Sequence, residues 1–208
     1  MKKRKSIFGP SKDEIWSQIA TDIGGEYVDG GFWGKDVLLY KHGEWQILLD
    51  TYTVTTSTGT TTTSTTYTRM RAPFINKDSL YFKIYRQGFF SSIGKFFGMQ
   101  DIEIGDRFFD DQFVIKGNNP EKINMLLADA KIKELCQKQP RIHFTIKDDE
   151  GWFGTDFPEG VDELSFQCVG VIKETVLLKS LFELFSVTLE RLVQIDSAYE
   201  DDPKVRLK

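Results

Sequence analysis

Histidine and cysteine are scarce in this chain of 208 residues, which contains two of each. His42 and His143 lie far apart in sequence, and neither has the i, i+4 spacing of a zinc-ligand pair. Cys136 and Cys168 form no CxxC motif, and isolated thiols in a chain of this length are typical of reduced, buried cysteines. The sequence therefore predicts no metal and no cofactor.

Long apolar runs and an excess of positive charge are also missing. No stretch reaches the 18 apolar residues that suggest a membrane-spanning helix. The net charge is −4, whereas proteins that bind nucleic acid generally are clearly basic, so nucleic acid is not an expected partner. Lys2–Lys5 is basic, but no apolar segment follows before Gly9, so it is not a secretory signal. We therefore expect a cytoplasmic protein.

Proline is absent from the most unusual segment, residues 51–68, where twelve of eighteen residues are threonine; the rest of the chain has five. Threonine is β-branched and favours strands, and Gly59 supplies the positive φ that a tight turn needs. We predict a β-hairpin that turns at Thr58–Gly59 and pairs Leu49 with Thr68. Serine- and threonine-rich stalks are usually proline-rich, so a mucin-like linker is disfavoured.

The residues that flank the threonine run alternate in polarity, as a half-buried sheet requires. In the predicted register, one face of the hairpin base carries Trp45, Ile47 and Met70, and the other face is mostly polar. The arm from Trp45 to Thr58 would span about 43 Å at about 3.3 Å per residue. A globule of this length has a radius of gyration of about 17 Å. The tip is therefore expected to project or to curl over another surface.

Helix signals occur at four places. Ser11 and Glu14 have the spacing of a capping box before a helix that ends at Gly24. Asn119–Pro120 is typical of a helix start, and Asp129 is expected to cap a second short helix. The segment 173–195 is a long helix with a wide apolar face, which lies across a sheet or in a dimer interface.

Strand patterns fill most of the remaining chain, and helices and strands do not alternate as in a parallel α/β protein. The sequence predicts one α+β domain over residues 1–208, with a mainly antiparallel sheet, a long threonine-rich hairpin, an N-terminal helix and a long C-terminal helix. Residues 1–10 and 197–208 are predicted to be flexible tails, and a soft subdivision is placed near 88–105. Further strands are expected around residues 80–86, 111–116, 141–147 and 164–172.

Acidic residues form two groups that are candidates for catalytic or cation sites. The stretch from Asp148 to Glu159 lacks the glycine and ligand pattern of an EF-hand, which leaves a looser cation site or a solvated turn. Asp106, Asp110 and Asp111 could supply paired carboxylates for acid–base chemistry, but aspartate in such a run more often marks a turn.

Large apolar side chains are crowded into residues 89–99. The aromatic loop contains Phe89, Phe90, Phe96 and Phe97. If exposed, it suits a protein partner or a membrane surface; if buried, it is a short helix that packs on the sheet.

Two motifs carry a resemblance to other sequences. Residues 109–118, FDDQFVIKGN, and residues 149–154, DEGWFG, resemble a family of uncharacterised bacterial proteins of unknown function. The resemblance extends over most of the chain and implies a bacterial source. It implies no activity, cofactor or site residue.

Unusual surface composition without a catalytic motif leads to a first hypothesis: a non-enzymatic binding protein whose partner is a protein or a small ligand. Its expected contact residues are Thr53, Thr55, Thr62, Phe89, Phe90, Phe96 and Phe97. An enzyme that uses clustered carboxylates with Arg69 and Arg71, or with a divalent cation, is the alternative. A peripheral membrane protein that uses Lys2–Lys5 and the aromatic loop is a third reading. A homodimer is compatible with each of the three.

Overall fold

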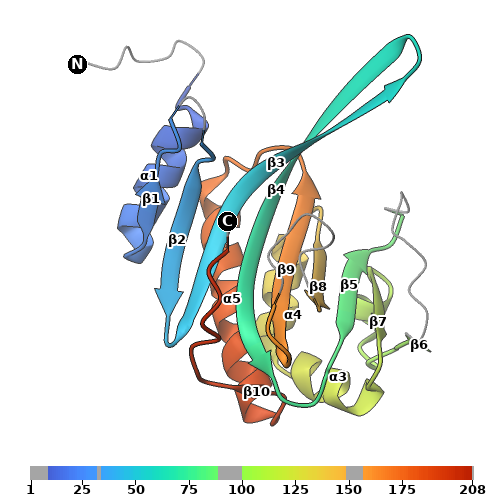
Figure 1. Cartoon of the computed structure of the whole chain (residues 1–208). Coiled ribbons are helices and arrows are strands. Elements are labelled where there is room, and N and C mark those ends of the chain that lie inside the picture. Colours follow the sequence, from blue (N-terminus) through green and yellow to red (C-terminus); the bar gives the residue numbers. More distant parts are fainter. Residues whose placement is uncertain (1–8, 32–33, 89–99, 149–156, 208) are drawn as a thin grey trace.

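An antiparallel sheet runs through the computed structural model, which describes residues 9–31, 34–88, 100–148 and 157–207. Its strands are β1 Glu26–Val28, β2 Val37–His42, β3 Trp45–Thr58, β4 Thr61–Asn76, β5 Phe82–Arg86, β6 Gln100–Asp101, β7 Phe113–Gly117, β8 His143–Lys147, β9 Val161–Val169 and β10 Ala198–Tyr199. They are ordered β1-β2-β3-β4-β9-β8-β5-β7-β6, and β10 also pairs with β4. Figure 1 shows the helices gathered on one side of this sheet.

The helices are α1 Lys12–Ile23, α2 Arg107–Asp110, α3 Pro120–Leu127, α4 Ala130–Lys138 and α5 Thr175–Gln194. The predicted capping box is present, because the Glu14 backbone N–H donates to Ser11 Oγ and the Ser11 N–H donates to the Glu14 carboxylate. Gly24 ends α1 in the left-handed conformation, as expected. The α+β class, the hairpin, the N-terminal helix and the long C-terminal helix are confirmed.

The core lies between the sheet and its helical layer, and α5 contributes more side chains to it than any other described helix. Phe144 on β8 lies in its centre, with ring centroids 5.5 Å from Phe82 and 5.5 Å from Phe185. Trp16 on α1 is fully buried and its indole N–H donates to the Ile172 carbonyl. This hydrogen bond ties the N-terminal helix to the segment that leads into α5.

The hairpin register differs from the prediction by two residues. Leu49 pairs with Met70, and the turn is Gly59–Thr60. Gly59 has a φ of 59° at the first turn position, which only glycine adopts readily. The predicted turn would have placed Thr58, a β-branched residue, at that position. Because side chains alternate, a shift of two residues leaves the predicted faces unchanged, and the apolar base is buried as expected.

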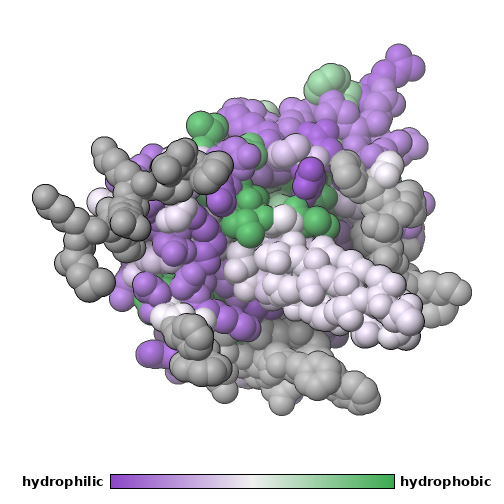
Figure 2. Space-filling view, turned by 90° about the horizontal axis from the view of Figure 1, so that it is seen from above, coloured by the Kyte–Doolittle hydropathy of each residue, from purple (hydrophilic) through white to green (hydrophobic). Residues whose placement is uncertain are grey.

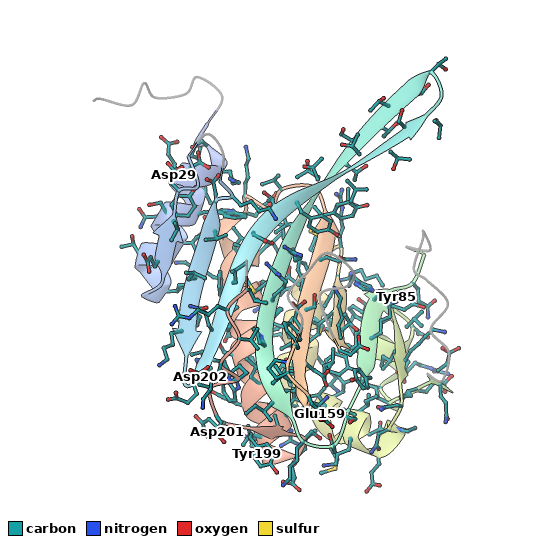
Figure 3. The ribbon with its side chains drawn as sticks, viewed as in Figure 1. Asp29, Tyr85, Glu159, Tyr199, Asp201 and Asp202 are labelled. Atoms are coloured by element: carbon teal, nitrogen blue, oxygen red, sulfur yellow. The ribbon has the colours of Figure 1, made fainter. Side chains whose placement is uncertain are left out.

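The predicted loose tail from Ser197 is wrong for its first residues. Ala198 and Tyr199 pair with Asn76 and Ile75 of β4, and Ser197 is fully buried. Tyr199 receives a cation–π contact from Lys77, at the end of the molecule opposite the hairpin tip (Figure 3). Residues 1–8 and most of the predicted subdivision near 88–105 lie outside the described residues. The sheet itself is continuous from β4 through β9 and β8 to β5.

Replacing Phe144 tests the position of the core. We expect Phe144→Ala to lower the free energy of unfolding by about 3–5 kcal/mol, because it leaves a cavity between two aromatic rings. The control is Phe108→Ala, whose side chain is 67% exposed and whose loss should change stability by under about 0.5 kcal/mol. Urea denaturation measures both values. Equal effects of the two substitutions would show that the core is misplaced.

Candidate functional site

The outer half of the threonine hairpin projects beyond the rest of the sheet (Figure 1). The β2 ladder on β3 stops at Leu49, and the β9 ladder on β4 stops at Thr68. Beyond a single bridge between Tyr67 and Gly170, these two strands pair only with each other among the described residues. Every residue from Thr53 to Ser64 is exposed. We call residues 53–64 the distal hairpin.

Hydroxyl groups face each other across one side of this hairpin. Thr53 Oγ1 lies 2.9 Å from Thr66 Oγ1, Thr55 Oγ1 lies 2.9 Å from Ser64 Oγ, and Ser57 Oγ lies 3.4 Å from Thr62 Oγ1. The structure thus brings the predicted contact residues Thr53, Thr55 and Thr62 together on one hydroxyl ladder. Cross-strand pairs of this kind contribute about 0.2–1 kcal/mol each, so they add to the order of a ribbon with little core.

The distal hairpin has no charged residue. Val54 is its only large apolar residue, and the Val54 side chain is 46% exposed. Figure 2, seen from above, shows it as a pale band of intermediate hydropathy, with both hydrophilic and hydrophobic residues beside it. Its surface is therefore made of methyl and hydroxyl groups. Covering such a surface desolvates no ion, and its hydroxyl groups can exchange water for hydrogen bonds to a partner.

Aromatic stacking and a hydroxyl clamp hold the base of the hairpin. The Tyr52 and Tyr67 rings stack with centroids 5.0 Å apart, and the Tyr52 hydroxyl donates to Gln167. Thr68 Oγ1 donates to the Gly170 carbonyl at 2.7 Å and accepts from the Ile172 N–H at 2.9 Å. The hairpin is thereby tied to β9 and to the segment before α5 at the place where it leaves the sheet.

Asp50, Arg69 and Arg71 form a buried ion-pair cluster just below this base. Arg69 donates through Nε at 2.9 Å and Nη2 at 2.7 Å to the two oxygens of Asp50, and Arg71 Nη2 donates at 3.0 Å to one of them. Asp50 and Arg71 are both fully buried. The two arginines of the enzyme hypothesis thus share the Asp50 carboxylate, and this cluster braces β3 against β4.

The outer face of the sheet continues this polar character towards β5 (Figure 3, near Tyr85). Burial, together with the nearby charges of Lys116 and Lys147, lowers the pKa of Lys83 to about 8. Burial and the charges of Lys83 and Lys147 lower the pKa of His143 to about 3. Both ring nitrogens of His143 are buried with no hydrogen-bond partner among the described residues. The histidine lies on β8, between β9 and β5, and is neutral at pH 7.

The acidic run on α2 has local structural roles. Asp106 caps α2 by accepting from the Phe109 N–H, and the hydrogen bond from Lys133 holds its pKa below the ordinary value. Asp110 accepts from the Ile104 N–H. Asp110 and Asp111 line an open groove of about 830 Å³, which Arg107 and Asp101 also border. The run therefore caps, ends and follows a short helix, whereas the sequence predicted a turn there.

Several predicted features fall outside the described residues. These are the aromatic loop with Phe89, Phe90, Phe96 and Phe97, the acids Asp149 and Asp156, and the basic segment Lys2–Lys5. Within residues 9–31, 34–88, 100–148 and 157–207, no three His, Cys, Asp or Glu side chains come together as metal ligands, and no helix is long and apolar enough to cross a membrane.

The sequence did not predict the stacking of Tyr52 on Tyr67 or the contact of Gly170 with the hairpin. Tyr52 and Tyr67 stand at symmetrical distances from the true turn, so the correct register would have placed them opposite each other. No local signal indicates Gly170, because its contact with Thr66 depends on a distant pairing.

The fold defines the chain as an α+β protein with a two-layer arrangement. Its structure is similar to the crystal structure of the mycobacterial trehalose monomycolate transport factor A, TtfA, with a TM-score of 0.50 and 7% sequence identity. The match covers 87% of this chain and 94% of that chain, and it shows a likeness of fold alone. No family model and no curated protein matches the sequence, so the resemblance to uncharacterised bacterial proteins stays a prediction.

Removing the carboxylate of Asp50 tests the brace. Asp50→Asn should lower the free energy of unfolding by about 3 kcal/mol, because the buried Arg71 and the partly buried Arg69 guanidinium groups lose a shared counter-charge. Glu190→Gln, which breaks the exposed pair with His42, should cost under about 1 kcal/mol. Chemical denaturation at pH 7 compares the two. A cost at Asp50 no larger than that at Glu190 would refute the brace.

Lowering the pH should destabilise the protein through His143. Its folded-state pKa is about 3 against an ordinary value of 6.5, so below pH 6.5 the unfolded chain binds a proton that the folded chain does not. Stability should therefore fall by about 1–2 kcal/mol between pH 7 and pH 5 from this residue. The measurement is the pH dependence of urea unfolding in the wild type and in His143→Phe. An unchanged pH slope in the variant would contradict the assignment.

Proposed function

We propose that this protein is a non-enzymatic binding protein that docks a protein partner through the distal hairpin. The observation that carries the proposal is a fully exposed, uncharged, two-stranded arm that extends beyond the sheet and is braced at its base. Isolated two-stranded ribbons are marginally stable in water, so an ordered arm of this length is explained better by contact with a partner than by a role in the core.

The chemistry of the arm favours a protein surface over a small charged ligand. Its hydroxyl ladder and exposed backbone edges offer donors and acceptors along a line, and its methyl groups offer apolar contact. This combination suits an extended polypeptide, which presents the same groups at the same spacing. The open, convex form of the arm supports docking rather than enclosure of a small molecule.

A capture experiment tests the proposal. Thr53, Thr55 and Thr62 are changed together to aspartate, which places three charges on the hydroxyl ladder. The tagged wild type and variant are compared as baits in lysate of the source cells, with partners identified by mass spectrometry. We expect partner recovery to fall by about tenfold or more, because the covered charges lose their hydration.

The matched control also gains three aspartates at exposed positions, on other elements: Thr21, Val28 and Met125. It should recover the partner at the wild-type level. Circular dichroism confirms that all baits are folded. Equal recovery by the hairpin variant and the wild type would remove the distal hairpin as the docking surface.

A further inference from the structure

The direction of the backbone groups on the distal hairpin follows from one contact. In an antiparallel pair, residues alternate between those that exchange backbone hydrogen bonds with the facing residue and those whose N–H and C=O point outward. The Gly170 N–H donates to the Thr66 carbonyl at 2.8 Å, so Thr66 belongs to the outward-pointing kind. Its cross-strand partner Thr53 therefore also points outward.

Alternation extends this assignment along the strand. With Thr53 outward, the backbone groups of Thr51, Thr55 and Ser57 also point away from β4, along an edge of β3 that pairs with no other strand among the described residues. The cross-strand hydroxyl contacts agree, because they occur at the 53–66, 55–64 and 57–62 pairs, and outward-pointing pairs have the closer side chains. Each of these residues presents one N–H and one C=O.

This edge lacks the protection that edge strands normally carry. The strands at the two ends of the sheet are short: β1 has three residues and begins with Glu26, and β6 has two and ends with Asp101. The edge of β3 from Thr51 to Thr58 has no charge and no proline, and its register with β4 is unbroken. Natural proteins block long flat edges with charges, prolines or bulges, so an unblocked edge of this length marks a pairing site.

We propose that the β3 edge at Thr51–Ser57 pairs antiparallel with the same edge of a second copy of this chain. The proposal rests on the proposed function and names the partner. The residues whose backbone groups point outward have odd numbers in both copies. When the two edges pair antiparallel about a two-fold axis at an even-numbered residue, each odd-numbered residue faces an odd-numbered residue of the other copy, so their backbone groups can bond. The segment is uncharged, so the two copies do not repel each other there.

The opposite edge of the hairpin is a poorer site. On β4, Gly170 already occupies the carbonyl of Thr66, and the exposed outward residues are Thr62 and Ser64. The β3 edge offers the longer run of outward groups. It begins where the pairing of β2 with β3 ends, at Leu49. On the even-numbered face, such pairing covers the exposed Val54 with a neighbouring strand.

Two proline variants separate the edges. Thr55 and Ser64 face each other and share one hydroxyl contact, so Thr55→Pro and Ser64→Pro lose the same cross-strand bond. Each removes one outward N–H, the first from β3 and the second from β4. Sedimentation equilibrium of the full chain is measured up to about 100 μM. We expect a wild-type dimer, a dissociation constant raised at least about tenfold in Thr55→Pro, and a wild-type value in Ser64→Pro.

A second measurement does not depend on the prolines. Nitroxide labels are placed at Thr55→Cys or Ser64→Cys, while native Cys136 and Cys168 are buried. With strands about 4.8 Å apart, the label-to-label distance between copies should be about 8 Å longer for position 64 than for position 55, because β4 lies outside β3 in the paired arms.

The outcomes decide between the two proposals. A monomeric wild type, equal effects of the two prolines, or a shorter distance at position 64 would overturn self-pairing. If the wild type is monomeric but the triple aspartate variant still loses another captured protein, the docking function stands and only the identity of the partner is wrong. If the dimer forms through other surfaces and capture is unchanged by the aspartates, both proposals fail.

Discussion

The ion pair between Asp50 and Arg69 is the interaction on which the projecting arm depends. It lies at the level where β2 and β9 stop supporting the hairpin, and it joins β3 to β4 through two parallel hydrogen bonds. Bidentate pairs of this kind fix direction as well as distance. Together with the Tyr52–Tyr67 stack and the Thr68 clamp, it sets the angle at which an otherwise unsupported ribbon leaves the sheet. Without that base, the distal hairpin would have only its own ladder with β4, threonine propensity and hydroxyl pairs to order it.

The fold class and most elements were predictable because their signals are local. The capping residues Ser11, Asn119 and Asp129 mark helix starts, and alternation marks the strands. The faces of the hairpin were also predictable, since they depend on parity. Its register was not, because several turns are compatible with a near-uniform threonine run and only the cost of a positive φ at Thr58 decides between them. Two contacts could not be predicted, because both join segments that are distant in sequence. These are the pairing of Ala198 with Asn76 and the hydrogen bond from Gly170 to Thr66.

The residues of the candidate site were predictable, but the direction of their backbone groups was not. The sequence indicates that Thr53, Thr55 and Thr62 belong to one surface, and the structure places them on one ladder. Which backbone groups point outward depends on the contact between Gly170 and Thr66, which has no sequence signature. The same limit applies to Arg69 and Arg71: the sequence offers them as catalytic cations, and only their shared contact with Asp50 shows that they brace the hairpin.

Residue-resolved amide exchange of the hairpin at two protein concentrations tests the central claim most directly, namely that an ordered arm presents one backbone edge for pairing. The account predicts that the amides of Thr53, Thr55 and Ser57 exchange quickly in dilute solution and slowly in concentrated solution. The amides of Val54 and Thr56, which face β4, should be protected at both concentrations. Fast exchange at all of these positions, protection that does not alternate in dilute solution, or fast exchange of Thr53, Thr55 and Ser57 in concentrated solution would contradict it.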